Sequence, residues 1–110
     1  MVDIVEEVSR LCEELWLKKK LRESMPDAQQ ATLHVTRAVG QLIIDVTLDV
    51  TWPGGRNACS QFGVDCVEWG IRDLGWKVDV LRVRFQAALT ELQTLQGNGQ
   101  QNRNGSMQPA

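Results

Sequence analysis

Hydrophobic and polar positions alternate strictly in the centre of the chain. From Leu42 to Trp52 every second residue is apolar, and the positions between Ile44 and Trp52 hold only Asp and Thr. A period of two places the apolar side chains on one face of a strand and the polar ones on the other. We therefore predict a strand over 41–52, buried on one side, in the antiparallel arrangement typical of such sheets.

The run over 31–39 also alternates and is rich in β-branched residues, which favours a second strand. Gly40 leaves only a short link between the two runs, so we predict a hairpin. The segment Trp52-Pro53-Gly54-Gly55 then ends the second strand, because proline lacks a backbone N–H and glycine tolerates positive φ.

Before the strands, the apolar residues from Ile4 to Trp16 recur every three or four positions. This spacing predicts an amphipathic helix with one face toward the core. Asp3 precedes the stripe as an N-terminal cap. We predict one helix over 3–23, with Cys12 and Trp16 on the buried stripe.

After the strands, helical spacing returns and predicts a helix over 60–74 that ends before Gly75. The apolar residues that carry this spacing are Val64, Val67, Ile71 and Leu74.

The segment 76–84 has two interpretations. Val78 and Val80 alternate with polar residues, which favours a strand. Apolar residues from Leu81 onward recur at spacings of four and three, which indicates a helix that begins before Phe85 and continues to Gln96. We expect a strand followed by a helix from Phe85, with the helical alternative for 78–84 left open.

The predicted order is α–β–β–α–β–α, which places the chain in the α+β class, with a small, mainly antiparallel sheet packed against helices. A ferredoxin-like unit that lacks its first strand has the first five of these elements in this order. With 110 residues the chain has the size of a single domain, which we place at 1–96. The segment 97–110 is rich in Gly, Asn and Gln, and we predict a disordered polar tail.

Net charge and cysteine content limit the classes of function and the cellular compartment that we expect. A net charge of −2 argues against a nucleic-acid binder that acts through bulk electrostatics. Three cysteines cannot all pair, and the first residues are charged rather than apolar. We therefore expect reduced thiols in a cytoplasmic protein, with the nucleus as an alternative.

The residues that usually perform catalysis are scarce. His34 is the only histidine, and Cys59 and Cys66 are seven positions apart, which is not the spacing of a zinc knuckle. Asp45 and Asp49 would lie about 13 Å apart along a strand, too far for an acid–base pair. We predict a protein that is not an enzyme, with no catalytic residue, cofactor or metal.

Basic residues lie at the C-terminal end of the first predicted helix, in the order Lys18-Lys19-Lys20-Leu21-Arg22. Cations at this position suit the helix dipole, and they also resemble a patch that contacts phosphates. One functional hypothesis is thus a small RNA-binding or RNA-processing accessory protein. Its candidate contacts are Lys18, Lys19, Lys20, Arg22, Arg37, Arg82 and Arg84. Trp69 and Trp76 are the tryptophans expected to be exposed, whereas Trp16 and Trp52 are expected in the core.

The hypothesis that we prefer is a regulatory or accessory protein-interaction module. A three-stranded sheet has free edges, and three amphipathic surfaces exceed what one small domain covers. We expect a homodimer formed through a strand edge or a helical stripe, together with a protein partner and no association with membranes. The candidate stripe is Leu81, Phe85, Leu89, Leu92 and Leu95.

Overall fold

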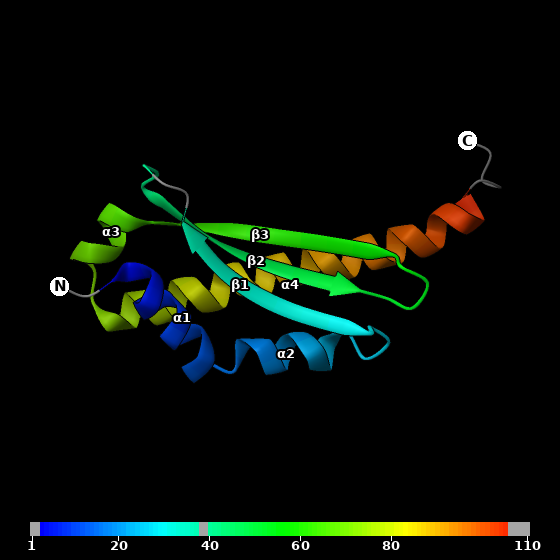
Figure 1. Ribbon diagram of the computed structural model, residues 1–110, viewed down its shortest axis with the longest axis horizontal. Coiled ribbons are helices and arrows are strands. Elements are labelled where there is room, and N and C mark those ends of the chain that lie inside the picture. The colour runs from blue at the N-terminus through cyan, green and yellow to red at the C-terminus, as the bar shows by residue number, and fades with distance from the viewer. Residues whose placement is uncertain (1–2, 38–39, 106–110) are drawn as a thin grey trace.

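The computed structural model describes residues 3–37 and 40–105, and Figure 1 shows a mixed α+β fold. The fold class predicted from the sequence is therefore confirmed, but the order of the elements differs from the prediction. The elements are α1 (Ile4–Glu14), α2 (Leu17–Ser24), β1 (Gln30–Arg37), β2 (Ile43–Thr51), β3 (Asn57–Asp65), α3 (Cys66–Ile71) and α4 (Leu74–Gly105).

The three strands form one antiparallel sheet in the order β1-β2-β3. Consecutive strands pair directly, so the helical crossover of a ferredoxin-like unit does not occur. Leu48 in the central strand lies opposite Leu33 on one side and Ser60 on the other. Ile44, Val46, Leu48 and Val50 are fully buried and the Asp and Thr residues between them are partly exposed, which confirms the alternation from Ile44 onward. Leu42, predicted on the same face, lies before the strand and is 57% exposed.

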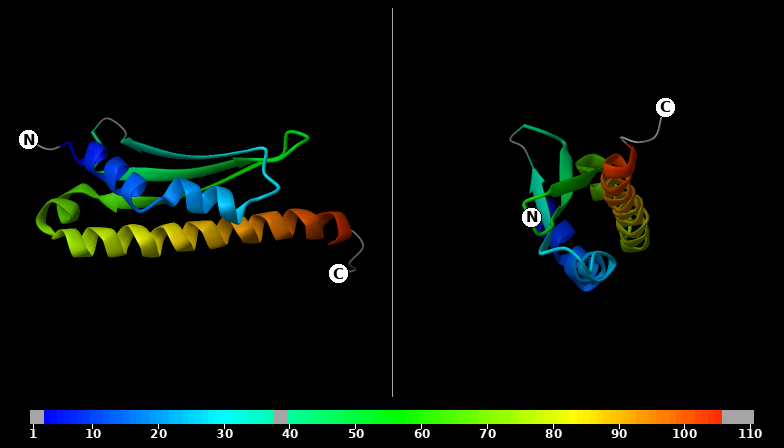
Figure 2. Two further views of the ribbon diagram at one scale, coloured as in Figure 1. Left: turned by 90° about the horizontal axis from the view of Figure 1, so that it is seen from below. Right: turned by 90° about the vertical axis from the view of Figure 1, so that its right-hand side faces the viewer.

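All helices lie on one face of the sheet, as the two views in Figure 2 show. The α1 and α2 helices pack beneath β1, and α4 packs beneath β3. The core lies between this helical layer and the apolar face of the sheet. Its fully buried large side chains are Val8, Leu17, Leu21, Met25, Ile44, Val46, Leu48, Val50, Val64, Trp69, Leu81 and Leu92.

The predicted helix over 60–74 is wrong in its first part, because Asn57–Asp65 is strand β3. Phe62 and Val64 share the inner face of β3 with two small residues, so the alternation was weak in the sequence. A short helix, α3, begins only after Asp65, whose carboxylate accepts hydrogen bonds from the N–H groups of Val67 and Glu68.

The predicted strand over 76–84 is also wrong, because these residues belong to α4. Leu81 and Phe85 are buried against the sheet, one helical turn apart. Burial of this stripe outweighs the β propensity of Val78 and Val80. The helix α4 continues to Gly105, into the segment 97–110 for which disorder was predicted, and residues 106–110 lie outside the described residues.

The predicted first helix is broken into two. The carboxylate of Asp3 caps α1 by accepting a hydrogen bond from Val5 N–H at 2.9 Å, as predicted. The helix then ends at Glu14, and Trp16 adopts φ 58° and ψ 35° before α2 begins. Trp16 is the only described residue other than glycine with positive φ, a conformation that usually requires glycine after a helix.

A partly buried carboxylate joins α1 to α3 and α4. Glu7 accepts hydrogen bonds from the indole of Trp69 and from Lys77 Nζ, the latter at 3.0 Å. Lys77 also lies 5.3 Å from the centre of the Trp69 ring. Burial raises the pKa of Glu7, but the two hydrogen bonds and the nearby charges of Lys77 and Arg10 outweigh it, so its pKa lies below 4.5.

Replacing this carboxylate should lower the free energy of unfolding and make that free energy depend less on pH in the acid range. Because the folded pKa of Glu7 is depressed, its stabilisation is complete above about pH 4.5 and is lost as the pH falls through the folded value. We expect Glu7→Gln to lower the free energy of unfolding at neutral pH by about 1–2 kcal/mol. The difference from the unsubstituted protein should shrink in acid, as measured by urea unfolding at a series of pH values.

Glu14→Gln is the matched control, because Glu14 forms an exposed ion pair with Arg10 at 3.3 Å. Such pairs contribute about 0.5 kcal/mol or less. An equal effect of both substitutions, or a gap for Glu7→Gln that persists in acid, would contradict this role of Glu7.

Candidate interaction surfaces

The outer edge of β1 has unpaired backbone groups. Gln29 N–H donates to Thr51 O, and Trp52 N–H donates to Arg56 O, so odd-numbered residues of β2 face β1 and even-numbered residues face β3. In an antiparallel pair, alternate residues carry the ladder bonds. The N–H and C=O groups of Ala31, Leu33 and Val35 therefore point away from β2 and have no backbone partner among the described residues.

The opposite edge, on β3, is partly closed. The side chain of Arg84, from α4, donates a hydrogen bond to the carbonyl of Gly63, which points outward from β3. Edge strands are commonly protected by charged side chains of this kind. No side chain of the described residues protects β1 in this way, and its sequence QATLHVTR contains no Lys, Pro or Gly, with its one charged residue at its end.

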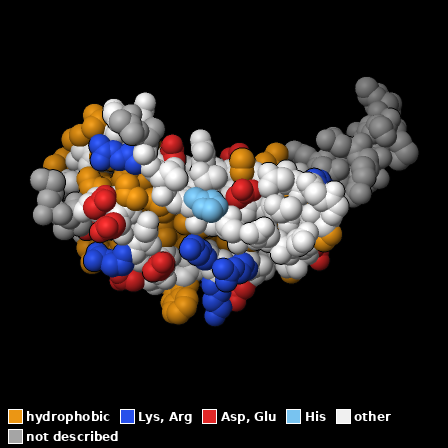
Figure 3. Space-filling view, in the orientation of Figure 1, with side chains coloured by type: hydrophobic (Ala, Val, Ile, Leu, Met, Phe, Trp, Pro, Cys, Tyr) orange, Lys and Arg blue, Asp and Glu red, His pale blue; other side chains and the backbone are white. Residues whose placement is uncertain are grey.

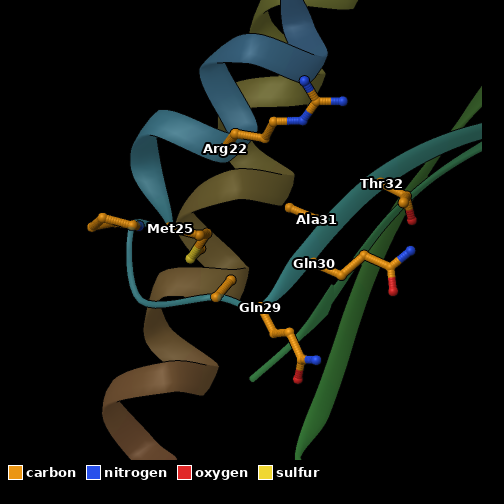
Figure 4. Close-up of a pocket in the computed structure, with 8 residues that line it drawn as sticks. Arg22, Met25, Gln29, Gln30, Ala31 and Thr32 are labelled. Carbon is orange, nitrogen blue, oxygen red and sulfur yellow. The ribbon is translucent and has the colours of Figure 1, made fainter. Parts of the chain in front are cut away.

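Two hollows border β1 where it adjoins α1 and α2. The larger, of about 410 Å³, lies between the end of α2 and the start of β1. In Figure 4, Arg22 extends from α2 toward β1, and Ala31 points toward the helices. The smaller, of about 60 Å³, is lined by Leu33 and Val35 of the strand and by Lys18 of α2. The inner side chains of Ala31 and Val35 are thus partly exposed along the edge of the strand, whereas Leu33 between them is buried.

A second surface lies on α2. Trp16 is 67% exposed, and Lys19 Nζ lies 5.8 Å from the centre of its ring. Trp16, Lys18, Lys19 and Arg22 surround a hollow of about 330 Å³ that also touches Glu13. We call these four residues the α2 platform. Basic side chains gather in this region beneath the sheet in Figure 3.

The cations of α2 are free of ion pairs within the described part of the chain, where the paired cations are Arg10, Arg72 and Lys77. Glu14 pairs with Arg10 instead of a residue of α2, because the helix breaks after it. The positive charge of the platform is therefore offset only by exposed acids nearby.

The other predicted basic contacts do not join the platform. Arg37 is at the far end of β1, where its Nε donates to Gln41 O at 2.9 Å. Arg84 lies against β3, at the opposite edge of the sheet, and Arg82 is exposed on α4. Of the seven predicted contacts, α2 gathers Lys18, Lys19 and Arg22, with Lys20 exposed on the same helix.

The helical stripe predicted for self-association lies in the core of the single chain. Leu81, Phe85, Leu89 and Leu92 are at most 5% exposed, and only Leu95, at 40%, is accessible. The stripe packs against the sheet and is not available to a second molecule in this fold.

Exposed apolar side chains occur instead near α3. Val67 and Ile71 lie one turn apart on α3 and are 59% and 77% exposed. Leu42 lies beside the start of this helix, since its carbonyl accepts a hydrogen bond from Cys66 N–H at 2.8 Å. Figure 3 shows apolar side chains at this end of the molecule.

The tryptophans differ from the prediction in three cases. Trp52 is buried as expected, but Trp16 is exposed and Trp69 is fully buried. Trp76 is partly buried and packs edge-on against Trp69, with ring centres 6.4 Å apart. The break after α1 directs Trp16 out of the stripe to which its spacing assigned it, and no feature of the sequence marks that break.

The side chains that could act in catalysis or bind a metal do not lie together. His34 and Cys59 lie on the polar face of the sheet, on different strands, whereas Cys66 is buried at the start of α3. Burial raises the pKa of the Cys12 thiol to about 11, so this thiol is protonated at neutral pH. The described residues contain no group of three or more His, Cys, Asp or Glu side chains that could hold a metal ion.

Within the described residues, no helix is both long enough and apolar enough to cross a membrane. Comparison with protein-family models, with curated proteins and with solved structures gives no match.

The left-handed backbone conformation of Trp16 should lower the stability of the protein. A residue other than glycine in the left-handed region costs roughly 1–2 kcal/mol, and the exposed indole contributes little burial in return. After allowance for the greater freedom of glycine in the unfolded chain, Trp16→Gly should raise the free energy of unfolding by about 0.5–1 kcal/mol. Urea unfolding measures this change.

The matched control is Leu15→Gly, because Leu15 has φ −88° and packs against the core. This substitution should destabilise the protein by about 1 kcal/mol or more. A loss of stability in Trp16→Gly similar to that in Leu15→Gly would show that the indole supports the fold.

Proposed function

We propose that this protein is a non-enzymatic interaction module that self-associates through the free edge of β1. Two copies related by a two-fold axis would pair their β1 strands antiparallel and form a continuous six-stranded sheet. The observation that carries this proposal is the unprotected outer edge of β1, with unpaired backbone groups at three successive odd positions.

The side chains along β1 suit a second copy. Its polar face presents Thr32, His34 and Thr36, none of which carries a fixed charge that would repel the same residue in another molecule. Because the outward backbone groups belong to odd-numbered residues, an axis through His34 pairs Leu33 with Val35 of the second copy. This register also buries part of the apolar surface in the two hollows.

The cytoplasm or the nucleus is the compartment that we propose. All three cysteines are free, and Cys59 is exposed, which suits a reducing environment. We also propose that the assembled protein regulates or assists a protein partner. A role without catalysis is supported by the placement of His34 and Cys59 on different strands and of Cys66 in the core.

A proline at Val35 tests the edge directly. Proline removes an outward N–H that the ladder to β2 does not use, and edge strands tolerate its φ. We expect light scattering after size exclusion to give twice the chain mass for the unsubstituted protein at tens of micromolar, and the monomer mass for Val35→Pro. Retained near-ultraviolet circular dichroism would show that the variant is folded.

Gln61→Pro is the matched control, because Gln61 is exposed on β3 and its N–H also points outward. This variant should remain dimeric. A monomeric parent protein, or loss of the dimer in Gln61→Pro but not in Val35→Pro, would contradict the proposal. Dissociation by Ile71→Asp alone would assign the interface to the apolar cluster beside α3 instead.

A cysteine at His34 tests the register. In a pair centred on this residue the two Cα atoms lie about 4.5 Å apart, within the range that a disulfide spans. We expect His34→Cys, with Cys59→Ser to remove the exposed thiol, to form a covalent dimer on mild oxidation. The product is measured by non-reducing electrophoresis.

Thr36→Cys in the same background is the control, because Thr36 would face Thr32 of the second copy and not itself. Equal cross-linking at both positions would indicate random collision and would contradict the register.

A further inference from the structure

Trp16 is held in an unfavourable conformation without contributing to the core. Its φ of 58° is one that glycine normally supplies, and 67% of its surface is exposed. Strain of this kind persists where the surrounding structure imposes it, and it gathers at sites of function. Its flat indole is presented to solvent at the junction of α1 and α2.

The cations around Trp16 lie on one side of α2. Lys18, Lys19 and Arg22 border the same hollow as the indole, and its volume of about 330 Å³ is within the range of ligand sites. Lys20 does not border the hollow. An accessible aromatic face beside three unpaired cations combines a stacking surface with charges that attract phosphate.

We propose that the α2 platform binds single-stranded nucleic acid, with a base stacked on Trp16 and the adjoining phosphates bound by Lys18, Lys19 and Arg22. A single strand is favoured over a duplex, because only an unpaired base offers its face to an indole. The stacking position is separate from the dimer contact, since Trp16 and Lys19 do not border the hollows beside β1, whereas Lys18 and Arg22 line both those hollows and the platform.

The burial of α2 argues against a lipid surface as the ligand. Membrane-bound helices insert an apolar face that bears several large side chains. The apolar residues of α2, Leu17 and Leu21, are fully buried in the core, so Trp16 is the only large apolar side chain among the described residues that borders the hollow.

Binding is measured by fluorescence anisotropy of a labelled oligonucleotide, as single-stranded RNA, single-stranded DNA and the corresponding duplex. We expect either single strand to bind at least about tenfold more tightly than the duplex, and the better of the two identifies the sugar preference. Affinity should fall with salt, with a slope of about 0.7 for each phosphate bound. Equal binding of duplex and single strands would overturn the proposal.

Two pairs of variants separate stacking from general attraction. Trp16→Gly should weaken binding about tenfold or more while the protein stays folded, and Trp16→Phe should retain most of the affinity. Lys19→Glu should weaken binding several-fold more than Lys20→Glu, which makes the same change of charge away from the hollow. Equal losses for the two lysine variants, or unchanged affinity in Trp16→Gly, would refute the platform.

Two further arms identify other ligands. Binding to vesicles that contain phosphatidylserine, without binding to the oligonucleotides, would overturn the proposal in favour of a lipid. Binding to polyglutamate, without binding to the oligonucleotides, would overturn it in favour of an acidic protein segment. Val35→Pro should bind the oligonucleotide with unchanged affinity per chain, so loss of the dimer and loss of this site are distinguishable.

Discussion

The alternation of β2 is the constraint on which the rest of the structure depends. This strand pairs on both sides, and its apolar residues from Ile44 to Val50 are fully buried on one face only. Because the other face carries Asp and Thr, every helix has to pack on the same side of the sheet. The fold therefore has a single helical layer, a polar sheet face in contact with solvent and two outer strands, of which β1 has the unprotected edge.

Sequence patterns were sufficient where burial was regular. The strand β2, the hairpin at Gly40, the Asp3 cap and the burial of Cys12 all followed from periodicity and capping chemistry. The patterns were insufficient for β3, because its inner face includes the small residues Ala58 and Ser60, which interrupt the alternation of large apolar and polar residues. Of the apolar residues whose spacing predicted a helix over 60–74, Val64 is buried in β3, whereas Val67, Ile71 and Leu74 are exposed, so their helical spacing did not correspond to one buried helix face.

The candidate sites were predictable only in part, for a related reason. The basic run of α2 was evident from its composition, but which cations share a surface depends on tertiary structure, and Arg37 and Arg84 lie elsewhere. The exposure of Trp16 depends on a break between two helices whose sequence shows helical spacing throughout. The stripe assigned to self-association was a correct amphipathic pattern, but the sheet covers it, and periodicity alone does not distinguish an intramolecular partner from a second copy.

The break at Trp16 and the edge of β1 are parts of one arrangement. If α1 continued straight through 15–16, Leu17 and Leu21 would not both reach the core beneath β1, where they are fully buried. The bend that seats α2 under the strand also turns Trp16 outward and directs Lys18 and Arg22 toward the hollows that border β1. Those two cations therefore touch both surfaces, whereas Trp16 touches only the platform and Val35 only the strand edge. Trp16 adopts the left-handed conformation because a short amphipathic helix has to fit beneath an edge strand. The same bend leaves an aromatic ring and unpaired cations beside the open edge.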